Sequence, residues 1–324
     1  MRIGVPKEIK EQEYRVGMTP DSVRALINRG HTVLVQQSAG FEAGFSDEAY
    51  TLAGAELVST ADKIFATAEL IIKVKELQPQ ECQELRKDQV LFAYLHLAPD
   101  PVQAELLLAS GCVAIAYETV TDDQGRLPLL MPSSAVAGHL SVQAGAHCLE
   151  KTQGGRGVLL GEVVGAPAGK VVILGGGVVG TEALRVALGM GANVVVLDKS
   201  LSRLKVLETL FADSKLTTGD AKREVIEEHI RTADLVIGAV LVPGATAPKL
   251  VSRAMLRQMR VRSVIIDVSI DQGGCFETSH ATTHAAPTFF EEGVLHYCVA
   301  NMPAGVPHTA TLALNNATLP FIIA

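Results

Sequence analysis

The chain has 324 residues, of which 48% are hydrophobic and 19% are charged, and its net charge at pH 7 is -7. This length predicts about two domains, each able to bury a core, and this hydrophobic fraction excludes a disordered chain. The acidic balance argues against nucleic acid as a partner.

Cysteine spacing and charge distribution indicate the cellular compartment of the protein. The five cysteines form no CxxC pair, which indicates reduced thiols in a cytoplasmic protein and predicts no metal site. The N-terminus lacks the apolar stretch of a secretory signal. Residues 127–149 and 293–324 carry no Asp, Glu, Lys or Arg, but Pro, His, Ser, Asn or Gln interrupt both. We interpret them as buried segments and expect no membrane partner.

The first 120 residues alternate between short apolar, β-branched runs and helical segments. "RIGVPKE" reads as a strand and a turn, and Asp21 is the expected cap of a helix that stops before Gly30. Helices are expected at 61–67 and 101–110, and strands at 31–36, 70–76, 89–97 and 112–119. This alternation predicts a parallel sheet with helices on both faces.

The alternation restarts in the second half after a long helical stretch that follows Pro132. Strands are expected in "KVVILG", "NVVVLD", "DLVIGAV" and "SVIIDVS", with helices between them. The sequence therefore predicts an α/β fold made of two doubly wound units.

A glycine cluster follows the first strand of the second unit. Gly175, Gly177 and Gly180 form GxGxxG between an apolar strand and a helix, and the next strand ends in Asp198. These glycines permit a tight turn, a close approach to a pyrophosphate and helix–strand contact. Asp198 can accept the ribose hydroxyls, which favours NAD over NADP, although Arg203 is nearby. The alternative is a glycine turn without a ligand. The context favours a Rossmann dinucleotide-binding domain.

Three basic residues of the first half are candidates for substrate chemistry. Arg15 lies in a loop before a helix, and Lys75 and His96 lie at the ends of expected strands. The carboxyl ends of parallel strands are where open α/β sheets bind ligands. A guanidinium and an ammonium suit a carboxylate substrate, and an imidazole suits proton transfer. Alternatively, Arg15 is a solvated charge, Lys75 pairs with a glutamate, and His96 is a hydrogen-bonded core residue.

Polar residues of the second half add further candidates. Asp267 and Asp271 lie around the end of an expected strand, before a glycine turn, and Asn301 lies in a Pro- and Gly-rich loop. An acid at that position can face a nicotinamide ring. The alternatives are a helix cap for the aspartates and a turn for Asn301.

Long blocks of the chain resemble NAD-dependent alanine dehydrogenases. They include "MRIGVPKEIKEQEYRVGMTP", "IIKVKE", "AYLHLA", "AIAYETV", "QGGRGVLLG", "VVILGGGVVGTEA", "IDVSIDQGGCFETS" and "HYCVANMPAGVPHTATLALNNATLP". The related nicotinamide nucleotide transhydrogenases share the fold and some blocks. A transhydrogenase-like NAD(H)-binding subunit and a non-catalytic NAD-binding descendant remain the alternatives.

The resemblance implies reversible oxidative deamination of L-alanine to pyruvate and ammonium with hydride transfer to NAD. It implies that His96 and Asp271 are the acid/base pair, and that Arg15, Lys75 and Asn301 bind the substrate. The implied cofactor-binding residues are Ser134, Gly175, Gly177, Val178, Val179, Gly180, Asp198, Arg203, Val240, Leu241, Val268, Ser269, Ile270, Asp271, Val299, Ala300, Asn301 and Met302.

The resemblance also implies an order of domains and an assembly. We expect a substrate domain of residues 1–130 plus 308–324, an NAD-binding domain of residues 131–307, and a cleft between them. Family members are commonly hexamers, so a homo-oligomer is expected. The family continues beyond "LPFIIA" through further helix, so we expect a shortened chain whose apolar end is a poor helix terminus.

Overall fold

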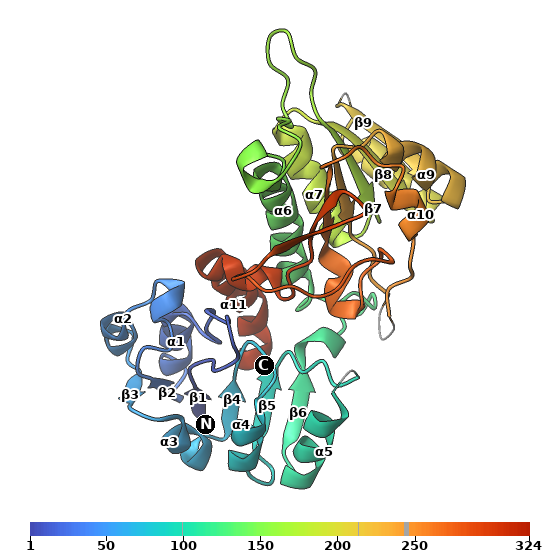
Figure 1. The fold of residues 1–324 in the computed structure, drawn as a ribbon. Coiled ribbons are helices and arrows are strands. Elements are labelled where there is room, and N and C mark those ends of the chain that lie inside the picture. The colour runs from blue at the N-terminus through green and yellow to red at the C-terminus, as the bar shows by residue number, and fades with distance from the viewer. Residues whose placement is uncertain (99, 213, 243–245) are drawn as a thin grey trace. The chain divides into compact units, whose positions relative to one another are not determined.

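The computed structural model describes residues 1–98, 100–212, 214–242 and 246–324 (Figure 1). The chain divides into two compact units. One consists of Met1–Ser133 with Pro303–Ala324, and the other of Ser134–Met302. Each unit has its own sheet with helices on both faces, which confirms the predicted fold class.

The first unit contains a six-stranded parallel sheet. Its strand order is β3 (Glu56–Val58), β2 (Thr32–Gln36), β1 (Arg2–Val5), β4 (Leu70–Ile72), β5 (Val90–Ala93) and β6 (Val113–Ala116). Its helices are α1 (Pro20–Ile27), α2 (Asp47–Leu52), α3 (Ala61–Thr67), α4 (Pro79–Glu84), α5 (Pro101–Ser110) and α11 (Pro307–Ile323), with short 3-10 turns η1 (Phe41–Ala43) and η2 (Tyr117–Thr119).

Alternate strand residues of this sheet enter two separate cores. Ile3 and Ile72 pack on one face with Leu26 of α1, Tyr50 of α2 and Leu314 of α11. The opposite face packs against the side chains of α3, α4 and α5. Because side chains alternate along a strand, both faces of a buried parallel sheet must be apolar, which explains the continuous apolar runs in the sequence.

The second unit contains a seven-stranded sheet. Its order is β12 (Thr288–Glu291), β13 (Val294–Tyr297), β11 (Val264–Asp267), β10 (Leu235–Gly238), β7 (Lys170–Leu174), β8 (Asn193–Asp198) and β9 (Leu216–Asp220), and only β12 pairs antiparallel. Helices α6 (Met131–Cys148), α7 (Val178–Gly189) and α8 (Leu201–Leu210) cover one face, and α9 (Arg223–Arg231) and α10 (Arg253–Leu256) the other. The 3-10 turns of this half are η3 (Lys151–Gln153), η4 (Val268–Gln272) and η5 (Met302–Gly305).

Several expected boundaries were wrong for identifiable reasons. Thr19, rather than Asp21, caps α1 and accepts a hydrogen bond from the Ser22 amide. Asp21 instead lies in the first turn, where its charge complements the helix dipole. The sequence also places the start of the helix after the glycine turn at Thr181, but α7 starts at Val178, directly after its N-cap Gly177.

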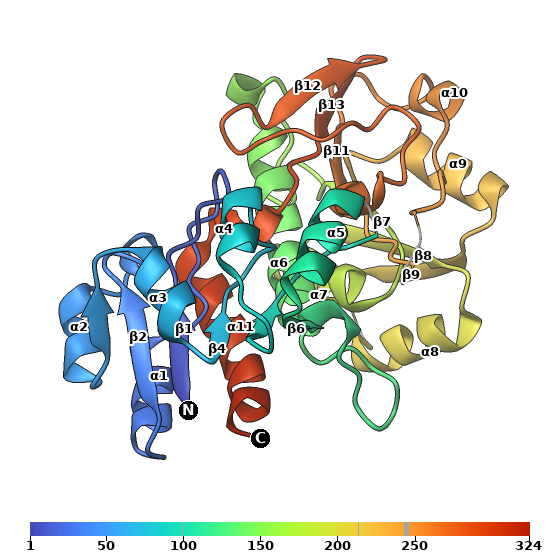
Figure 2. The same cartoon turned by 90° about the horizontal axis from the view of Figure 1, so that it is seen from below.

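The C-terminal segment forms a long helix. Helix α11 runs to Ile323 although Pro320 lies inside it. It packs on α1 and η1 of the same unit (Figure 2). Asn315 of α11 accepts hydrogen bonds from the Thr19 amide and hydroxyl and donates to the Gly17 carbonyl. These bonds attach α11 to the segment that follows Arg15.

The strands of the first sheet are shorter than predicted. Strand β5 ends at Ala93, because the amides of Leu95 and His96 donate to the carboxylate of Glu118 instead of to a neighbouring strand. Strand β4 ends at Ile72, and the Val74 amide donates to Glu8. Among the described helices, none combines the length and apolarity that crossing a bilayer would require.

Candidate functional site

The carboxyl edge of the first sheet collects the basic candidates. Strand β1 lies between β2 and β4, so the chain connections leave the sheet in opposite directions on its two sides. Ligands of open α/β sheets bind at such a point, beyond the carboxyl ends of the strands. Arg15 follows β1, Lys75 follows β4, and His96 follows β5.

Arg15 is buried and paired with Glu13. Its side chain is 2% exposed, and its Nε and Nη2 atoms donate to the two Glu13 carboxylate oxygens at 2.8 and 2.6 Å. Burial lowers the pKa of Arg15, but Glu13 more than offsets this, so the net shift is upward. The interpretation of Arg15 as a solvated charge is therefore wrong. Its paired carboxylate fixes the plane of the guanidinium.

Lys75 and His96 lie in direct contact. The Lys75 ammonium is 3.2 Å from His96 Nε2. An ammonium has no lone pair, so a protonated Lys75 requires Nε2 to be the acceptor in this contact. His96 Nδ1 lies 4.0 Å from a Glu118 oxygen. This arrangement suits an imidazole that takes up or releases a proton.

Tyr94 connects this pair with Arg15. Its ring stacks on the His96 ring with centroids 5.8 Å apart, and Arg15 lowers its pKa by charge. Burial dominates and raises the pKa of Tyr94 to about 12. The hydroxyl therefore stays protonated and donates to the Leu129 carbonyl at 2.5 Å. The three basic candidates thus belong to one cluster at the edge of the sheet.

Two candidate residues have unusual backbone conformations. His96 has φ 47° and Asn301 has φ 58°, both in the left-handed region that non-glycine residues seldom adopt. Such conformations persist where surrounding contacts enforce them, and they are frequent at functional sites. For His96 the enforcing contact is the Glu118 carboxylate, which accepts its amide at 2.6 Å.

In the second unit, the glycine turn lies at the carboxyl end of β7. A Cβ on Gly180 would lie 1.8 Å from the Gly175 carbonyl oxygen, and Gly175 has φ +103°. Packing and backbone geometry thus require both residues. A Cβ on Gly177 would meet nothing within 4 Å. No contact within the described chain requires a glycine at position 177, and this open space fits the close approach of a cofactor pyrophosphate.

Asp198 and Arg203 are held against this turn. The Asp198 carboxylate accepts the Gly176 amide at 2.6 Å and the Ser200 amide at 2.7 Å. Arg203 donates to the Gly176 carbonyl and the Thr181 hydroxyl. The carboxylate is therefore fixed at the end of β8, and the arginine braces the turn.

The remaining cofactor candidates follow other strands at the same edge. Val178 and Val179 open α7, Val240 and Leu241 follow β10, Val268, Ser269 and Ile270 lie in η4 after β11, and Val299, Ala300 and Met302 follow β13. Ser134 lies in the first turn of α6. The Ser269 hydroxyl donates to the Val240 carbonyl at 2.7 Å, which ties two of these loops together.

The two aspartates have different surroundings. Asp267 is fully buried, accepts the amides of Ser269 and Cys275, and caps η4, as the capping alternative predicted. Asp271 lies in η4, and its carboxylate accepts a hydrogen bond from the backbone amide of Asn301 at 3.3 Å. The second unit therefore brings together Asp271 and Asn301, while the first unit brings together the basic cluster.

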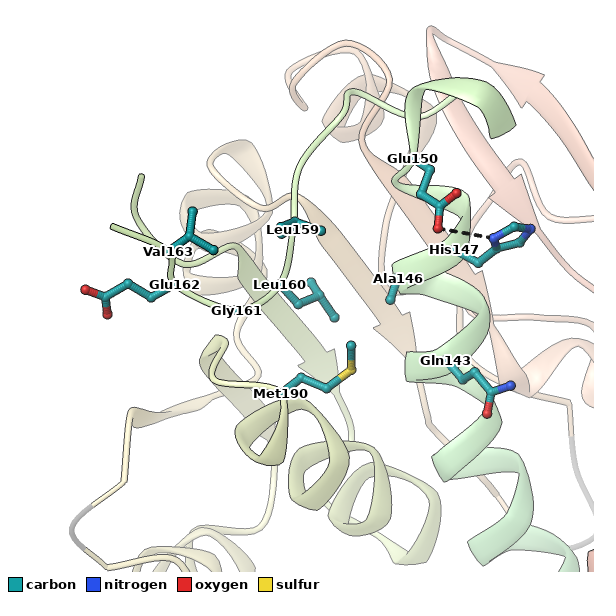
Figure 3. Close-up of a pocket in the computed structure, with 10 residues that line it drawn as sticks. All are labelled: Gln143, Ala146, His147, Glu150, Leu159, Leu160, Gly161, Glu162, Val163 and Met190. Carbon is teal, nitrogen blue, oxygen red and sulfur yellow. Dashed lines mark hydrogen bonds and ion pairs between the residues drawn. The ribbon is translucent and has the colours of Figure 1, made fainter. Parts of the chain in front are cut away.

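A hollow of about 390 Å³ in the second unit contains none of the candidate residues. It is lined by Gln143, Ala146, His147, Glu150, residues 159–163 and Met190, and Figure 3 shows His147 paired with Glu150 at 3.4 Å. A second hollow of about 490 Å³ lies at the amino ends of β7, β8 and β9, the sheet edge opposite the glycine turn. Neither hollow is assigned a role.

Both parts of the chain match models of known protein families. The family model for the alanine dehydrogenase/PNT N-terminal domain matches residues 4–137, and the model for the C-terminal domain matches residues 141–324. The chain belongs to the alanine dehydrogenase/PNT family.

Individual relatives are similar to this chain over nearly its whole length. An alanine dehydrogenase of Halomonas elongata is 55% identical over all of this chain and 87% of the relative. A solved L-alanine dehydrogenase structure has TM-score 0.96 and 54% identity, covering all of this chain and 89% of that one. The transhydrogenase structure from Sinorhizobium meliloti has TM-score 0.88 and 26% identity, covering 99% of this chain and 93% of that one.

The sequence analysis missed three members of the basic cluster, namely Glu13, Tyr94 and Glu118. Glu118 could have been found, because it lies near the end of the expected strand 112–119, just as His96 lies near the end of the expected strand 89–97. Glu13 is bonded to Arg15 and Tyr94 stacks on His96, and no local sequence pattern marks such contacts.

Proposed function

We propose that this chain is an L-alanine dehydrogenase that uses NAD. The observation that carries the proposal is the 55% identity to an alanine dehydrogenase over every residue of this chain. Two features support the proposal. The glycine turn would hold a nicotinamide cofactor, and the cluster of Arg15, Lys75 and His96 would bind a carboxylate substrate.

The first unit would bind the substrate carboxylate. Arg15 and Lys75 are cations whose side chains are almost fully buried, so their attraction for a carboxylate is weakly screened. His96, in contact with Lys75, would take up and return the protons that water and ammonia exchange at the substrate carbon. Asp271 would be the second acid/base group, and Asn301 a substrate contact.

The second unit would hold the cofactor. Gly175, Gly177 and Gly180 would admit the pyrophosphate, and the first turn of α7 would direct its amides at it. The loops after β8, β10, β11 and β13 would line the remainder of the cofactor. When bound, the nicotinamide would accept a hydride at C4. The proposed overall reaction converts alanine, NAD⁺ and water into pyruvate, ammonium, NADH and a proton.

The choice of NAD over NADP rests on Asp198 and Arg203. A carboxylate fixed at the end of β8 can accept ribose hydroxyls and repels a 2′-phosphate. Arg203 is engaged by the Gly176 carbonyl and the Thr181 hydroxyl, so neutralising a 2′-phosphate would require it to break those bonds. We further propose a homo-oligomer, as the family commonly forms.

The test is an absorbance assay of nicotinamide reduction with a panel of L-amino acids and both cofactors. We expect activity with alanine and NAD, and little with NADP. The variant Asp198→Ala should bind NAD more weakly and discriminate less against NADP, while Asp220→Ala, at the half-buried end of the neighbouring strand β9, should not. Cofactor reduction that does not depend on any amino acid, or discrimination unchanged in Asp198→Ala, would contradict these assignments.

A further inference from the structure

A fully buried lysine outside the candidate site lies between two buried glutamates. The Lys73 side chain is 0% exposed, and its ammonium is 3.0 Å from a Glu8 oxygen and 2.8 Å from a Glu81 oxygen. The two carboxylates are 1% and 5% exposed. The triad joins the segment after β1, the end of β4 and the first turn of α4.

Both glutamates of the triad also accept hydrogen bonds from the backbone around Lys75. The second Glu8 oxygen accepts the amide of Val74, the residue before Lys75, at 2.7 Å. The second Glu81 oxygen accepts the Gln78 amide at 2.8 Å and caps α4. Residues 73–78, which carry Lys75, are therefore fixed at both ends by carboxylates that share one ammonium.

Lys73 also affects the electrostatics of this region. Burial raises the pKa of Glu8, and Lys73 opposes that rise. Glu8 also interacts electrostatically with Arg15. Without the Lys73 ammonium, the two buried carboxylates would attract other cations of this region. Arg15 already interacts with Glu8, and Lys75 lies two residues beyond Lys73 on the segment that both carboxylates hold.

We propose that Lys73 is a positioning residue that occupies the Glu8 and Glu81 carboxylates and thereby keeps the Lys75 ammonium beside His96. The inference rests on the proposed function, since it assigns Lys73 to the same substrate site. A buried ion pair is weak evidence for added stability, because apolar residues of similar volume often serve as well. The role proposed here is one of charge and position.

The experiment is a double-mutant cycle of Lys73→Met and Glu8→Gln, with Lys63→Met on the exposed surface of α3 as the control. Met fills much of the lysine volume without its charge. Gln at position 8 keeps an oxygen that can accept the Val74 amide. We expect Lys73→Met to raise the KM for alanine and for pyruvate by about tenfold or more, because losing the ammonium adds one net negative charge beside the segment that carries Lys75.

The added Glu8→Gln substitution separates charge from packing. It should return the KM of Lys73→Met to within about threefold of the wild-type value, since it removes the surplus negative charge. A packing role for Lys73 would give no such rescue, because the second substitution only adds disturbance. If Lys73→Met alone fails to fold, the double variant Lys73→Met/Glu8→Gln still tests the proposal. A KM tenfold or more above the wild-type value in this double variant would overturn it.

The pH dependence provides a second readout. The groups that interact electrostatically with Glu8 are Lys73, Glu13, Glu81, Arg15 and Tyr117. Once Lys73 is replaced, the pKa of Glu8 loses its main lowering influence and rises further. The KM penalty of Lys73→Met should therefore shrink as the pH falls and Glu8 takes up a proton. A penalty that does not change with pH would contradict the proposal.

A crystal structure of Lys73→Met tests the inference independently of activity. We expect the Lys75 ammonium to leave the 3.2 Å contact with His96 Nε2 and turn toward Glu8 or Glu81. An unchanged Lys75 would overturn the inference even if the enzyme assay supports alanine dehydrogenase activity. Conversely, a wild-type protein without alanine-dependent activity would contradict the proposed function, while the displacement of Lys75 would still decide the inference.

Discussion

At the scale of single residues, this chain surrounds each candidate cation with a particular acceptor. Arg15 pairs with Glu13, Lys75 contacts His96, and Lys73 bridges Glu8 and Glu81. A buried charge without such a partner would be expensive, so each pairing fixes both the ionisation state and the direction of the side chain. Residues close in sequence, such as Lys73 and Lys75, therefore have different partners.

The acid/base assignment leads to a prediction for His96 and Asp271. We expect His96→Ala and Asp271→Asn each to lower kcat by about 10²- to 10⁴-fold, the usual contribution of a positioned acid or base. The reduced cofactor should still bind, because neither change alters the glycine turn. Stopped-flow turnover and NADH fluorescence titration measure the two effects. Near-normal turnover in both variants would remove the assignment.

At the scale of elements, the turn between β7 and α7 separates structural from functional glycines. Gly180 allows α7 to contact the carbonyl of Gly175, whereas Gly177 lies open. The GxGxxG pattern therefore contains two glycines that packing and backbone geometry require, Gly175 and Gly180, and one, Gly177, that we attribute to a ligand.

This difference gives a matched pair of variants. Gly180→Ala would put a Cβ 1.8 Å from a backbone oxygen, so we expect it to misfold or to lose several kcal/mol of stability. Gly177→Ala should cost only about 1 kcal/mol, as a poorer N-cap, but should greatly weaken NADH binding. Thermal unfolding and fluorescence titration provide the two readouts. If Gly177→Ala binds NADH normally, position 177 does not contact the cofactor.

Element boundaries mark where sequence patterns fail. The runs at 70–76 and 89–97 predict strands, yet β4 and β5 end early, because carboxylates of Glu8 and Glu118 take over the backbone amides. Periodicity records which residues are apolar, but it does not record which distant carboxylate replaces a neighbouring strand. The wrong cap of α1 has a similar origin, since Thr19 is also held by Asn315 of α11.

At the scale of the whole molecule, stability should depend on pH through a buried histidine. His296 in β13 is 0% exposed, with Nε2 at 2.8 Å from the Thr278 hydroxyl and Nδ1 at 3.0 Å from the Val294 carbonyl. Burial lowers the pKa of His296 below its ordinary value of 6.5. Below pH 6.5, His296 therefore binds a proton more readily in the unfolded chain than in the folded chain.

The sign of this linkage sets the expected result. Stability should fall as the pH drops below 6.5, by up to about 1.4 kcal/mol per pH unit for one proton. His296→Gln should reduce that slope, while a slope from His229, whose pKa is also lowered by burial, remains. Urea unfolding followed by circular dichroism between pH 7.5 and 5 measures it. An equally steep loss in His296→Gln would show that other groups control acid stability.

The sequence by itself determined the two parallel sheets, the dinucleotide turn with Asp198 and the basic candidates Arg15, Lys75 and His96. Apolar runs, glycine spacing and strand ends are local, so a linear reading recovers them. Only the tertiary structure decided which charges meet: Arg15 with Glu13, Lys75 with His96, and Lys73 with Glu8 and Glu81. These contacts depend on the order in which β1, β4, β5 and β6 line up in the sheet, and strand order arises from long-range packing that no short stretch encodes.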